Sequence, residues 1–346
     1  MEELKVVGLD LAKSVFQVHG IDARGRKVLG AKLKRGQVLE YFARLPVVRV
    51  GMEACAGAHE WARRLRGLGH EVKLMAPQHV KAYVQGNKTD ARDAAAIAEA
   101  AARESVPAVA VRTLEGQQMQ ALHRMREGLM KQRTATANQL RGLLAEFGVV
   151  MPAGVKKLRE QASLWCMQAG VELVVMREGA RVLLEQLGWL EERIARLEGQ
   201  IKQLHRVNAA SRLLETIPGV GLLGATAVVA SFGGCESFES ARKLASCLGL
   251  TPREHSSGGK QQLLGISKRG NGYIRKLLIH GARAVLRVRC NNPLYADSWE
   301  VRLAARRGTN VAAVALAAKN ARRIWALLRS GQAFDPAYGQ REALST

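Results

Sequence analysis

Four acidic residues of this chain occupy positions where an acid needs a specific explanation. Asp10 and Glu53 each close an apolar, strand-like run, in VGLD and VGME. Asp90 and Asp93 open the alanine-rich stretch DARDAAAIAEA, where a spacing of three places both carboxylates on one helical face. Singly, a strand-end turn explains Asp10, surface exposure explains Glu53, and helix capping explains Asp90. Capping leaves Asp93 unexplained, so the set predicts a shared chemical role.

The elements that position these acids follow from the pattern of residues 5–103. Three short segments rich in apolar or β-branched residues, at 5–12, 14–21 and 26–33, are separated by turn residues, which predicts strands joined by hairpins. Alternating helices and strands are then expected at 37–44, 47–53, 58–67 and 71–76, with further helices up to 103. This order is typical of a ribonuclease-H-like fold, because a Rossmann fold needs helical crossovers from its first strand onward.

In a ribonuclease-H-like sheet the first and fourth strands are parallel neighbours, so Asp10 and Glu53 are expected at one edge. The helix that carries Asp90 and Asp93 is expected to pack across that edge. Four converging carboxylates require cations, and hard oxygen ligands favour Mg²⁺ or Mn²⁺. Two such ions about 4 Å apart can stabilise the attacking and leaving oxygens of phosphodiester cleavage. Glu60 competes with Glu53 for its role, but it falls on a predicted helix.

The charge of the chain indicates a polyanionic partner. Lysine and arginine total 53 against 30 aspartates and glutamates, a net charge of +23, and residues 241–346 hold 19 basic and 5 acidic residues. Nucleic acid is favoured over an anionic membrane. The N-terminus is acidic and strand-like, unlike a signal peptide, and the five cysteines show no CxxC pairing. We therefore expect reduced thiols and a cytoplasmic location.

Residues 113–210 are predicted to form a helical arm. Apolar residues alternate there at spacings of three and four without a break, at Leu173, Met176, Ala180, Leu183, Leu187, Leu190, Ile194, Leu197, Ile201 and Leu204. This heptad seam favours a coiled coil that joins protomers into a dimer or tetramer. The alternative is a long bundle helix packed within the chain. The arm would separate an α/β domain at 1–112 from a mostly helical domain at 211–346.

Two stretches of the last domain are candidates for phosphate contact. TIPGVGLLGA (216–225) holds Gly219 and Gly221 in a GxGxxG pattern, but no strand precedes it, so a dinucleotide site is disfavoured. A helix–hairpin–helix that offers backbone N–H groups to phosphate is preferred, with a plain glycine turn as the alternative. Basic side chains expected to contact phosphates follow at Lys260, Lys268, Arg269, Arg275 and Lys276.

Ser256 and Ser257 lie between these stretches in HSSGG (255–259), flanked by basic residues. Serine–glycine turns are common and usually inert. The residues alone therefore do not favour a nucleophilic serine.

Over nearly its whole length the chain resembles the DEDD transposases of bacterial insertion sequences, the family of the bridge-RNA-guided recombinases. The first matching stretch looks most like the subgroup whose elements carry subterminal inverted repeats. The order and spacing of the stretches make the resemblance specific. They are VGLDLAKSVFQVHGID, GMEACAGAHEWA, LMAPQHVKAYVQGNKTDARDAAAIA, TIPGVGLLGATAVVASFG and LASCLGLTPREHSSGGKQQLLGISKRGNGYIRKLL.

The resemblance implies a RuvC-like domain whose four acids are the four singled out above. It also implies a C-terminal transposase domain whose serine precedes a glycine, which matches Ser257, with Ser256 as the competing neighbour. In such a family the serine attacks a phosphodiester and holds a covalent DNA intermediate, assisted by the acids and Mg²⁺. Target choice would be delegated to base pairing with a structured guide RNA.

The expected function is a transposase, a site-specific DNA recombinase that excises and inserts its own element. Two alternatives stay open. One is a metal-dependent, junction-resolving endonuclease that uses the acids without the serine. The other is a non-enzymatic, coiled-coil DNA-binding protein in which the acids are incidental.

Overall fold

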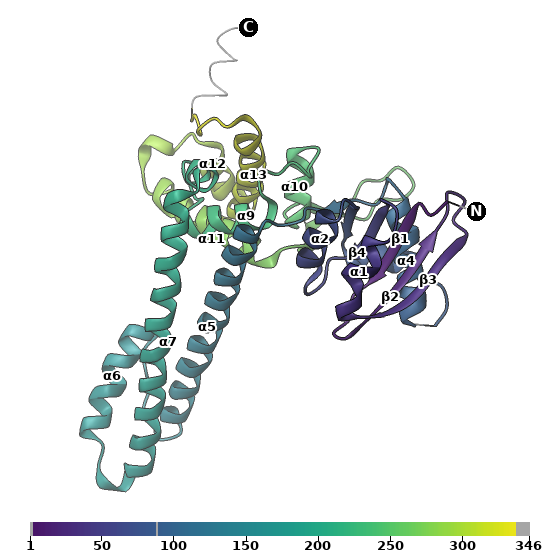
Figure 1. Ribbon diagram of the computed structural model, residues 1–346. Coiled ribbons are helices and arrows are strands. Elements are labelled where there is room, and N and C mark those ends of the chain that lie inside the picture. Colours follow the sequence, from purple (N-terminus) through teal and green to yellow (C-terminus); the bar gives the residue numbers. More distant parts are fainter. Residues whose placement is uncertain (1–2, 88, 337–346) are drawn as a thin grey trace. The chain divides into compact units, whose positions relative to one another are not determined.

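The computed structural model describes residues 3–87 and 89–336, which contain both helices and strands. The outer limits of the predicted domains, residues 1 and 346, lie outside these ranges. The chain divides into two compact units between Thr113 and Leu114 (Figure 1). The arm and the C-terminal helices thus belong to one unit. Among the described residues, no helix is both long and apolar enough to cross a membrane.

The first unit is built on a six-stranded mixed sheet in the order β3-β2-β1-β4-β5-β6. Antiparallel pairing joins β1 to β2 and β2 to β3, whereas β1, β4 and β5 are parallel neighbours. The predicted hairpins and the predicted pairing of the first and fourth strands are confirmed. The sixth strand, which pairs antiparallel with β5, was not expected. The strands are Val6–Asp10, Val15–Ile21, Lys27–Lys34, Arg49–Glu53, Glu71–Met75 and Ala108–Val109.

Helices cover both faces of this sheet. On one face Val7, Leu9, Val50 and Met52 are buried with the side chains of α1 (Val38–Ala43) and α2 (Ala58–Gly67). The alternate residues of β1 and β4 face α4 (Asp90–Ala102), whose buried residues are alanines and Ile97. Period-two alternation along the strands therefore separates a large apolar layer from a thin layer of small side chains. A short helix, α3 (Pro77–Val80), leads from β5 toward α4.

The second unit begins with the helical arm. Two long helices, α5 (Leu114–Ala145) and α7 (Val174–Val207), run side by side, with α6 (Val155–Gln168) beside α7 at the far end (Figure 1). The predicted helical arm is thus present, and it consists of three helices, of which α6 was not expected. Most of the predicted seam packs within the chain: Ala180 and Leu187 join a core with α5 and α6, and Ile201 packs against Met119.

The C-terminal helices surround a second core at the base of the arm. Within it, His123 is hydrogen-bonded to the hydroxyls of Tyr273 and Thr226, at 3.0 Å each. Burial, together with the smaller effect of the Arg126 charge, lowers the pKa of His123 to about 4. His123 is therefore neutral in the folded protein. The helices are α8 (Ala209–Glu215), α9 (Leu222–Phe232), α10 (Ala241–Cys247), α11 (Gly272–Arg289), α12 (Trp299–Arg307) and α13 (Thr309–Ser330).

A two-stranded hairpin interrupts these helices. Its strands, β7 (Pro252–Glu254) and β8 (Leu263–Ile266), pair antiparallel and are almost entirely exposed. The sequence predicted only a turn here. Exposed strands bury no alternate residues, so they leave no period-two apolar pattern to read.

Candidate active site and nucleic-acid interface

Asp10 and Glu53 end two parallel, neighbouring strands. Gly8 of β1 is paired with Gly51 of β4, and each acid lies two residues beyond its glycine. Because side chains alternate between faces, both acids project to the same face as the two glycine positions. That is the face covered by α4.

The two glycines allow α4 to lie very close to the sheet. A Cβ at position 8 would stand 2.5 Å from the backbone nitrogen of Ala98 and closer still to the carbonyl oxygen of Ala94. A Cβ at position 51 would overlap the Cβ of Ala101. Only glycine in the strands and small residues in the helix permit this approach. The first turn of α4 is thereby held above the end of β1.

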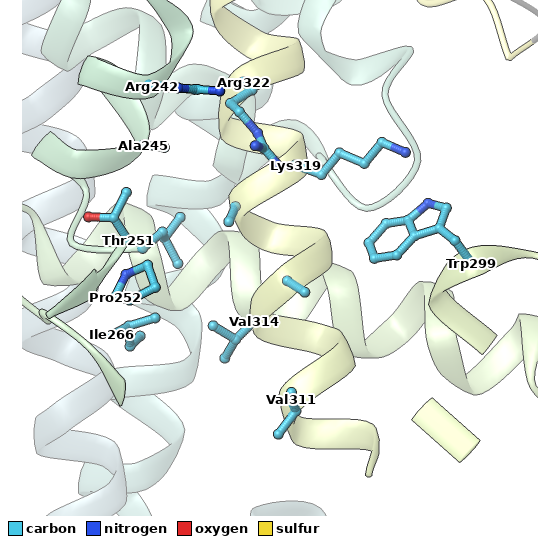
Figure 2. A pocket seen from close by; sticks show the side chains of 13 residues that line it. Arg242, Ala245, Thr251, Pro252, Ile266, Trp299, Val311, Val314, Lys319 and Arg322 are labelled. Atoms are coloured by element: carbon cyan, nitrogen blue, oxygen red, sulfur yellow. The ribbon is translucent and has the colours of Figure 1, made fainter. Parts of the chain in front are cut away.

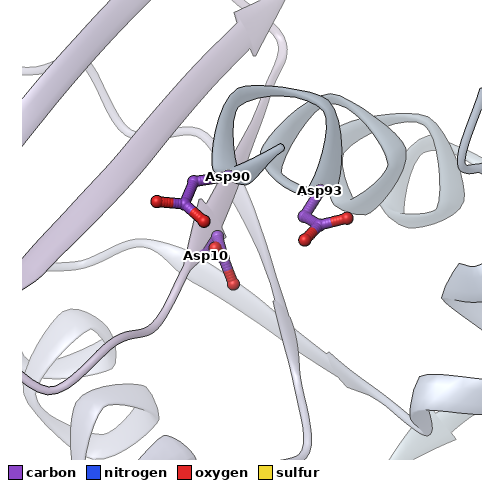
Figure 3. A group of neighbouring side chains, drawn as sticks. All are labelled: Asp10, Asp90 and Asp93. Carbon is purple, nitrogen blue, oxygen red and sulfur yellow. The ribbon is translucent and has the colours of Figure 1, made fainter. Parts of the chain in front are cut away.

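This packing brings three of the four predicted acids together. One carboxylate oxygen from each of Asp10, Asp90 and Asp93 lies within 4.8 Å of the other two (Figure 3). In an octahedral Mg²⁺ site, with oxygens at 2.0–2.1 Å, adjacent ligands are about 2.9 Å apart and opposite ligands about 4.2 Å apart. Binding one ion would therefore draw the three carboxylate oxygens closer together. The donors are hard oxygens, as Mg²⁺ and Mn²⁺ prefer, so the residues fit a divalent ion.

Helix capping does not explain these aspartates. Thr89 is the N-cap residue of α4, and its hydroxyl accepts a hydrogen bond from the Arg92 amide at 3.3 Å. Asp90 and Asp93 instead occupy the first turn, where the positive end of the helix dipole partly offsets their charge. That offset is small beside the repulsion of three clustered carboxylates, which a cation would relieve.

Glu53 lies outside the three-carboxylate group but within its electrostatic reach. Desolvation raises the pKa of the Cys55 thiol, and the carboxylates of Glu53 and Asp10 raise it further. Both acids therefore act on one nearby group. Glu60, the competing acid, is paired with Arg63 and Arg64 on α2, and hydrogen bonds from these arginines lower its pKa. Glu60 is thus engaged on its own helix.

Ser257 lies at the tip of the β7–β8 hairpin. It forms a bridge with Lys260, whose amide donates to the Ser257 carbonyl at 3.1 Å. Gly258 and Gly259 between them have φ of +57° and +76°, as a two-residue type I′ turn requires. The double glycine is therefore the turn itself. Ser257 is the last residue before it and is exposed.

The two neighbouring serines differ in what their hydroxyls do. The Ser256 hydroxyl donates to Glu254 at 2.7 Å and accepts from the Gln262 amide at 3.2 Å, which fixes it inside the hairpin. The Ser257 hydroxyl has no hydrogen bond to any residue that the structure describes. Of the two, Ser257 carries the hydroxyl that is available to a substrate.

The predicted phosphate-contacting residues separate into two groups. Lys260, Lys268 and Arg269 are exposed on the hairpin and the loop that follows it. Arg275 donates to the carbonyl of Leu248, at 2.9 Å, and also to that of Arg269. Lys276 is paired with Glu127 of α5, at 2.7 Å and 2.8 Å. Arg275 and Lys276 thus have partners within the unit and are less available for phosphate contact than the three exposed residues.

Gly219 and Gly221 join α8 to α9 and differ in their surroundings. Gly219 has φ of +87° and packs directly on Gly281 of α11; a Cβ on Gly281 would overlap the Gly219 carbonyl, and a Cβ on Gly219 would be tightly crowded. Gly221 is exposed, has open space around it, and precedes the N-terminus of α9. Close packing explains Gly219. Only Gly221 has room for a phosphate. The helix that precedes this turn excludes a dinucleotide-binding strand.

Sequence reasoning missed Gly8, Gly51 and Thr89. None of them carries a reacting group, but they set where the acids stand. A signal existed: a glycine two residues before the acid in both VGLD and VGME marks the same face of each strand. Threonine immediately before the first aspartate of α4 is likewise a capping signal.

Comparison with known proteins places these sites in a family. Residues 7–149 match the DEDD transposase model of the IS110 group, and residues 211–299 match the model described as Transposase IS116/IS110/IS902 family. A Pseudomonas aeruginosa protein named "Probable family 20 transposase" is 48% identical over 96% of this chain and 99% of its own length. The chain belongs to the IS116/IS110/IS902 transposase family.

A second relative, the Coxiella burnetii "Transposase for insertion sequence element IS1111A", is 45% identical over 95% of this chain and 90% of its own length. The predicted membership in the transposases of bacterial insertion sequences, the predicted enzyme class and the predicted DNA substrate are thereby confirmed: this transposase cuts and rejoins DNA. The DEDD family model and the acidic cluster together support the use of a divalent metal. The first matched range contains the four acids, and the second contains Ser257.

Proposed function

We propose that this transposase excises and inserts its insertion sequence through a covalent protein–DNA intermediate on Ser257. The Ser257 oxygen attacks a backbone phosphorus and loses its proton to solvent, and one P–O bond of the DNA breaks. One DNA end is then linked to the protein and the other leaves as a free hydroxyl. Attack by the hydroxyl of a partner strand restores the phosphodiester and the serine. The exposed Ser257 hydroxyl at the hairpin tip carries this proposal.

The acidic site is proposed to serve the same reaction from a ribonuclease-H-like, RuvC-like domain. The sheet order and the three gathered carboxylates support this assignment. Asp10, Asp90 and Asp93 would hold Mg²⁺, or Mn²⁺, with Glu53 as a further ligand. When bound, the ion stabilises charge on the phosphate oxygens. Because these aspartates stand on a strand end and a helix rather than on loops, they would hold the ion in a fixed position.

One trapping experiment tests both parts. Labelled DNA that carries the element junction is incubated with the protein and Mg²⁺, and a denaturant-stable adduct is sought. Ser257→Ala should abolish the adduct, whereas Ser256→Ala, its matched neighbour, should retain it. Asp93→Asn should also abolish it, while Glu99→Gln on the same helix should not. Metal-dependent nicking without an adduct would favour a junction-resolving nuclease, and binding without cleavage would favour a DNA-binding protein.

Target choice is proposed to rest on a structured guide RNA. The resemblance to bridge-RNA-guided recombinases motivates this proposal, and the net charge of +23 gives the protein ample capacity for a second polyanion. Nucleic acid extracted from the purified protein should contain one discrete RNA. A preparation that is free of RNA and still selects its target after ribonuclease treatment would rule the guide out.

Self-association is proposed to use the far end of the arm, because most of the heptad seam is already packed within the chain. The far end exposes Met167 (77%), Val171 (84%) and Val175 (84%), a cluster of apolar side chains that a second protomer would cover. Val175→Asp should lower the molar mass measured by light scattering. Val207→Asp changes another exposed valine (77%), at the other end of α7, and should leave the molar mass unchanged. An unchanged mass in both variants would refute the arm contact.

A further inference from the structure

A groove of about 600 Å³ runs along α13 of the second unit, and no step proposed above uses it (Figure 2). Val311, Val314 and Ala315 of α13 are among its apolar lining residues. Pro252 and Ile266 also line it, and these two residues are paired at the base of the hairpin that carries the serine. The groove is therefore continuous with the root of that hairpin.

Three cationic side chains line the same groove. They are Arg242 of α10 and, from α13, Lys319 and Arg322 (Figure 2). No carboxylate is among its lining residues in the part of the chain that the structure describes. Within that part, Arg242 and Arg322 also form no salt bridge. Figure 2 shows the guanidinium groups of Arg242 and Arg322 near each other, whereas Lys319 extends toward Trp299. Two neighbouring guanidinium groups that lack an acid partner repel each other, and an anion between them would remove that cost.

An aromatic ring completes the groove. Trp299 lines it, and the Lys319 ammonium lies 4.6 Å from the centroid of the Trp299 ring. An apolar trough with an aromatic wall and cations at its rim matches the chemistry of a nucleotide, which joins a flat base to a phosphate. The volume falls within the range of about 300–1,000 Å³ that is usual for small-ligand sites.

We propose that this groove binds one unpaired nucleotide of the DNA strand on which Ser257 acts. The base would enter the apolar trough, and the adjacent phosphates would contact Arg242 and Arg322. The choice of DNA rests on the proposed function, because the hairpin whose base lines the groove carries the nucleophile. An unstacked base is needed, since a base inside a duplex offers no free face.

The position of the groove sets which nucleotide it holds. Ser257 lies five residues beyond Pro252, which corresponds to about 17 Å of extended strand. At about 3.4 Å per stacked nucleotide, that span equals about five nucleotides. The bound nucleotide would therefore lie within about five positions of the scissile phosphate. Holding it would fix the register of the strand along the hairpin.

Binding is tested apart from cleavage with the full chain carrying Ser257→Ala. The probes are a fluorescent single-stranded oligo-dT and the same strand with abasic sites. We expect the intact strand to bind at least about fivefold more tightly, the lower end of stacking effects. Ala315→Phe, which fills the trough, should remove this preference. Arg322→Gln should reduce the slope of log affinity against log salt by about 0.7. Lys243→Gln, a charge-matched neighbour of Arg242, should change neither.

Three results would overturn the proposal. The first is equal binding of the intact and abasic strands. The second is a base preference that survives Ala315→Phe in a protein whose thermal unfolding is unchanged. The third is a preference seen with ribonucleotide strands only, which would assign the groove to RNA. These failures are distinct from failure of the proposed function, because the Ser257 adduct is scored in a separate assay with active protein.

Discussion

Replacing Gly8 by alanine should disable the acidic site without changing any acid. The new Cβ would lie 2.5 Å from the Ala98 nitrogen and closer to the Ala94 oxygen, whereas such contacts are not found below 3.0 Å. Helix and sheet must therefore separate by more than about 0.5 Å. Both obstructing atoms belong to the backbone, so no side-chain rotation can relieve the overlap. The first turn of α4 would move away from Asp10.

The expected size of the effect follows from that shift. Overpacking of this kind costs about 1–3 kcal/mol of stability, which a folded domain can survive. Catalytic groups must be held within about 0.5 Å of their working geometry, and a misplacement of about 1 Å can cost on the order of 100-fold in rate. Metal-dependent cleavage by the Gly8→Ala protein should therefore fall on the order of 100-fold, while the protein stays folded.

The same substitution at Gly51 provides a control, because a second substitution can relieve the overlap that it creates. The nearest obstacle to a Cβ at position 51 is the Ala101 side chain, and the next is the Ile97 carbonyl oxygen at 3.1 Å. Gly51→Ala should weaken activity, and adding Ala101→Gly should recover most of it. Ala101→Gly should not rescue Gly8→Ala, because the atoms that obstruct position 8 are backbone.

The assay pairs Mn²⁺ binding, followed by electron paramagnetic resonance, with cleavage of labelled DNA. Thermal unfolding of each variant checks that the protein is folded. Wild-type Mn²⁺ affinity and cleavage in Gly8→Ala would refute the packing argument. So would equal rescue of both glycine variants by Ala101→Gly, because it would mean that the two positions act through general loosening.

Three further predictions concern the second unit. Lys268→Gln should reduce the slope of log affinity for duplex DNA against log salt by about 0.9. Lys276→Gln should reduce this slope less, because the Lys276 ammonium is already paired with Glu127. Titrations of both variants with salt measure the two slopes. Between pH 4 and 6.5 a histidine in the unfolded chain (pKa about 6.5) is mostly protonated, whereas His123 in the folded protein (pKa about 4) is mostly neutral. Protonation therefore favours the unfolded state at low pH, and the free energy of unfolding should rise by about 3 kcal/mol from pH 4 to 6.5. Urea unfolding at both pH values should show this dependence reduced in His123→Gln. Gly281→Ala should cost about 1–3 kcal/mol in urea unfolding, because its Cβ would strike the Gly219 carbonyl.

The first unit was readable from sequence because its signals are local. Each buried strand is a short apolar run, and an acid that closes such a run stands out against it. The hairpins followed from the short turns between strands, and the pairing of the first and fourth strands followed from an element order typical of a ribonuclease-H-like fold. The distance between α4 and the sheet could not be predicted from the sequence. It depends on the contact of Gly8 with Ala94 and Ala98, which lie some 85 residues further along the chain.

The second unit was read less well because its decisive contacts are distant in sequence. Nothing near Lys276 reveals that Glu127, on another helix, neutralises it. The heptad seam identified a buried helical face correctly but not its partner, since the same apolar spacing serves α5 and α6 of one chain or a second protomer. The hairpin strands carry no burial pattern at all.

The acids and the serine are held in physically opposite ways. Asp10, Asp90 and Asp93 stand on a strand end and a helix whose packing leaves no space for one added methyl group, as a metal geometry demands. Ser257 stands on an exposed two-stranded hairpin, and such hairpins are marginally stable by themselves in water. In the proposed reaction, a substrate strand along the hairpin would hold Ser257 in register. The groove at its root, whose walls include the Pro252–Ile266 pair, is placed to supply that anchor.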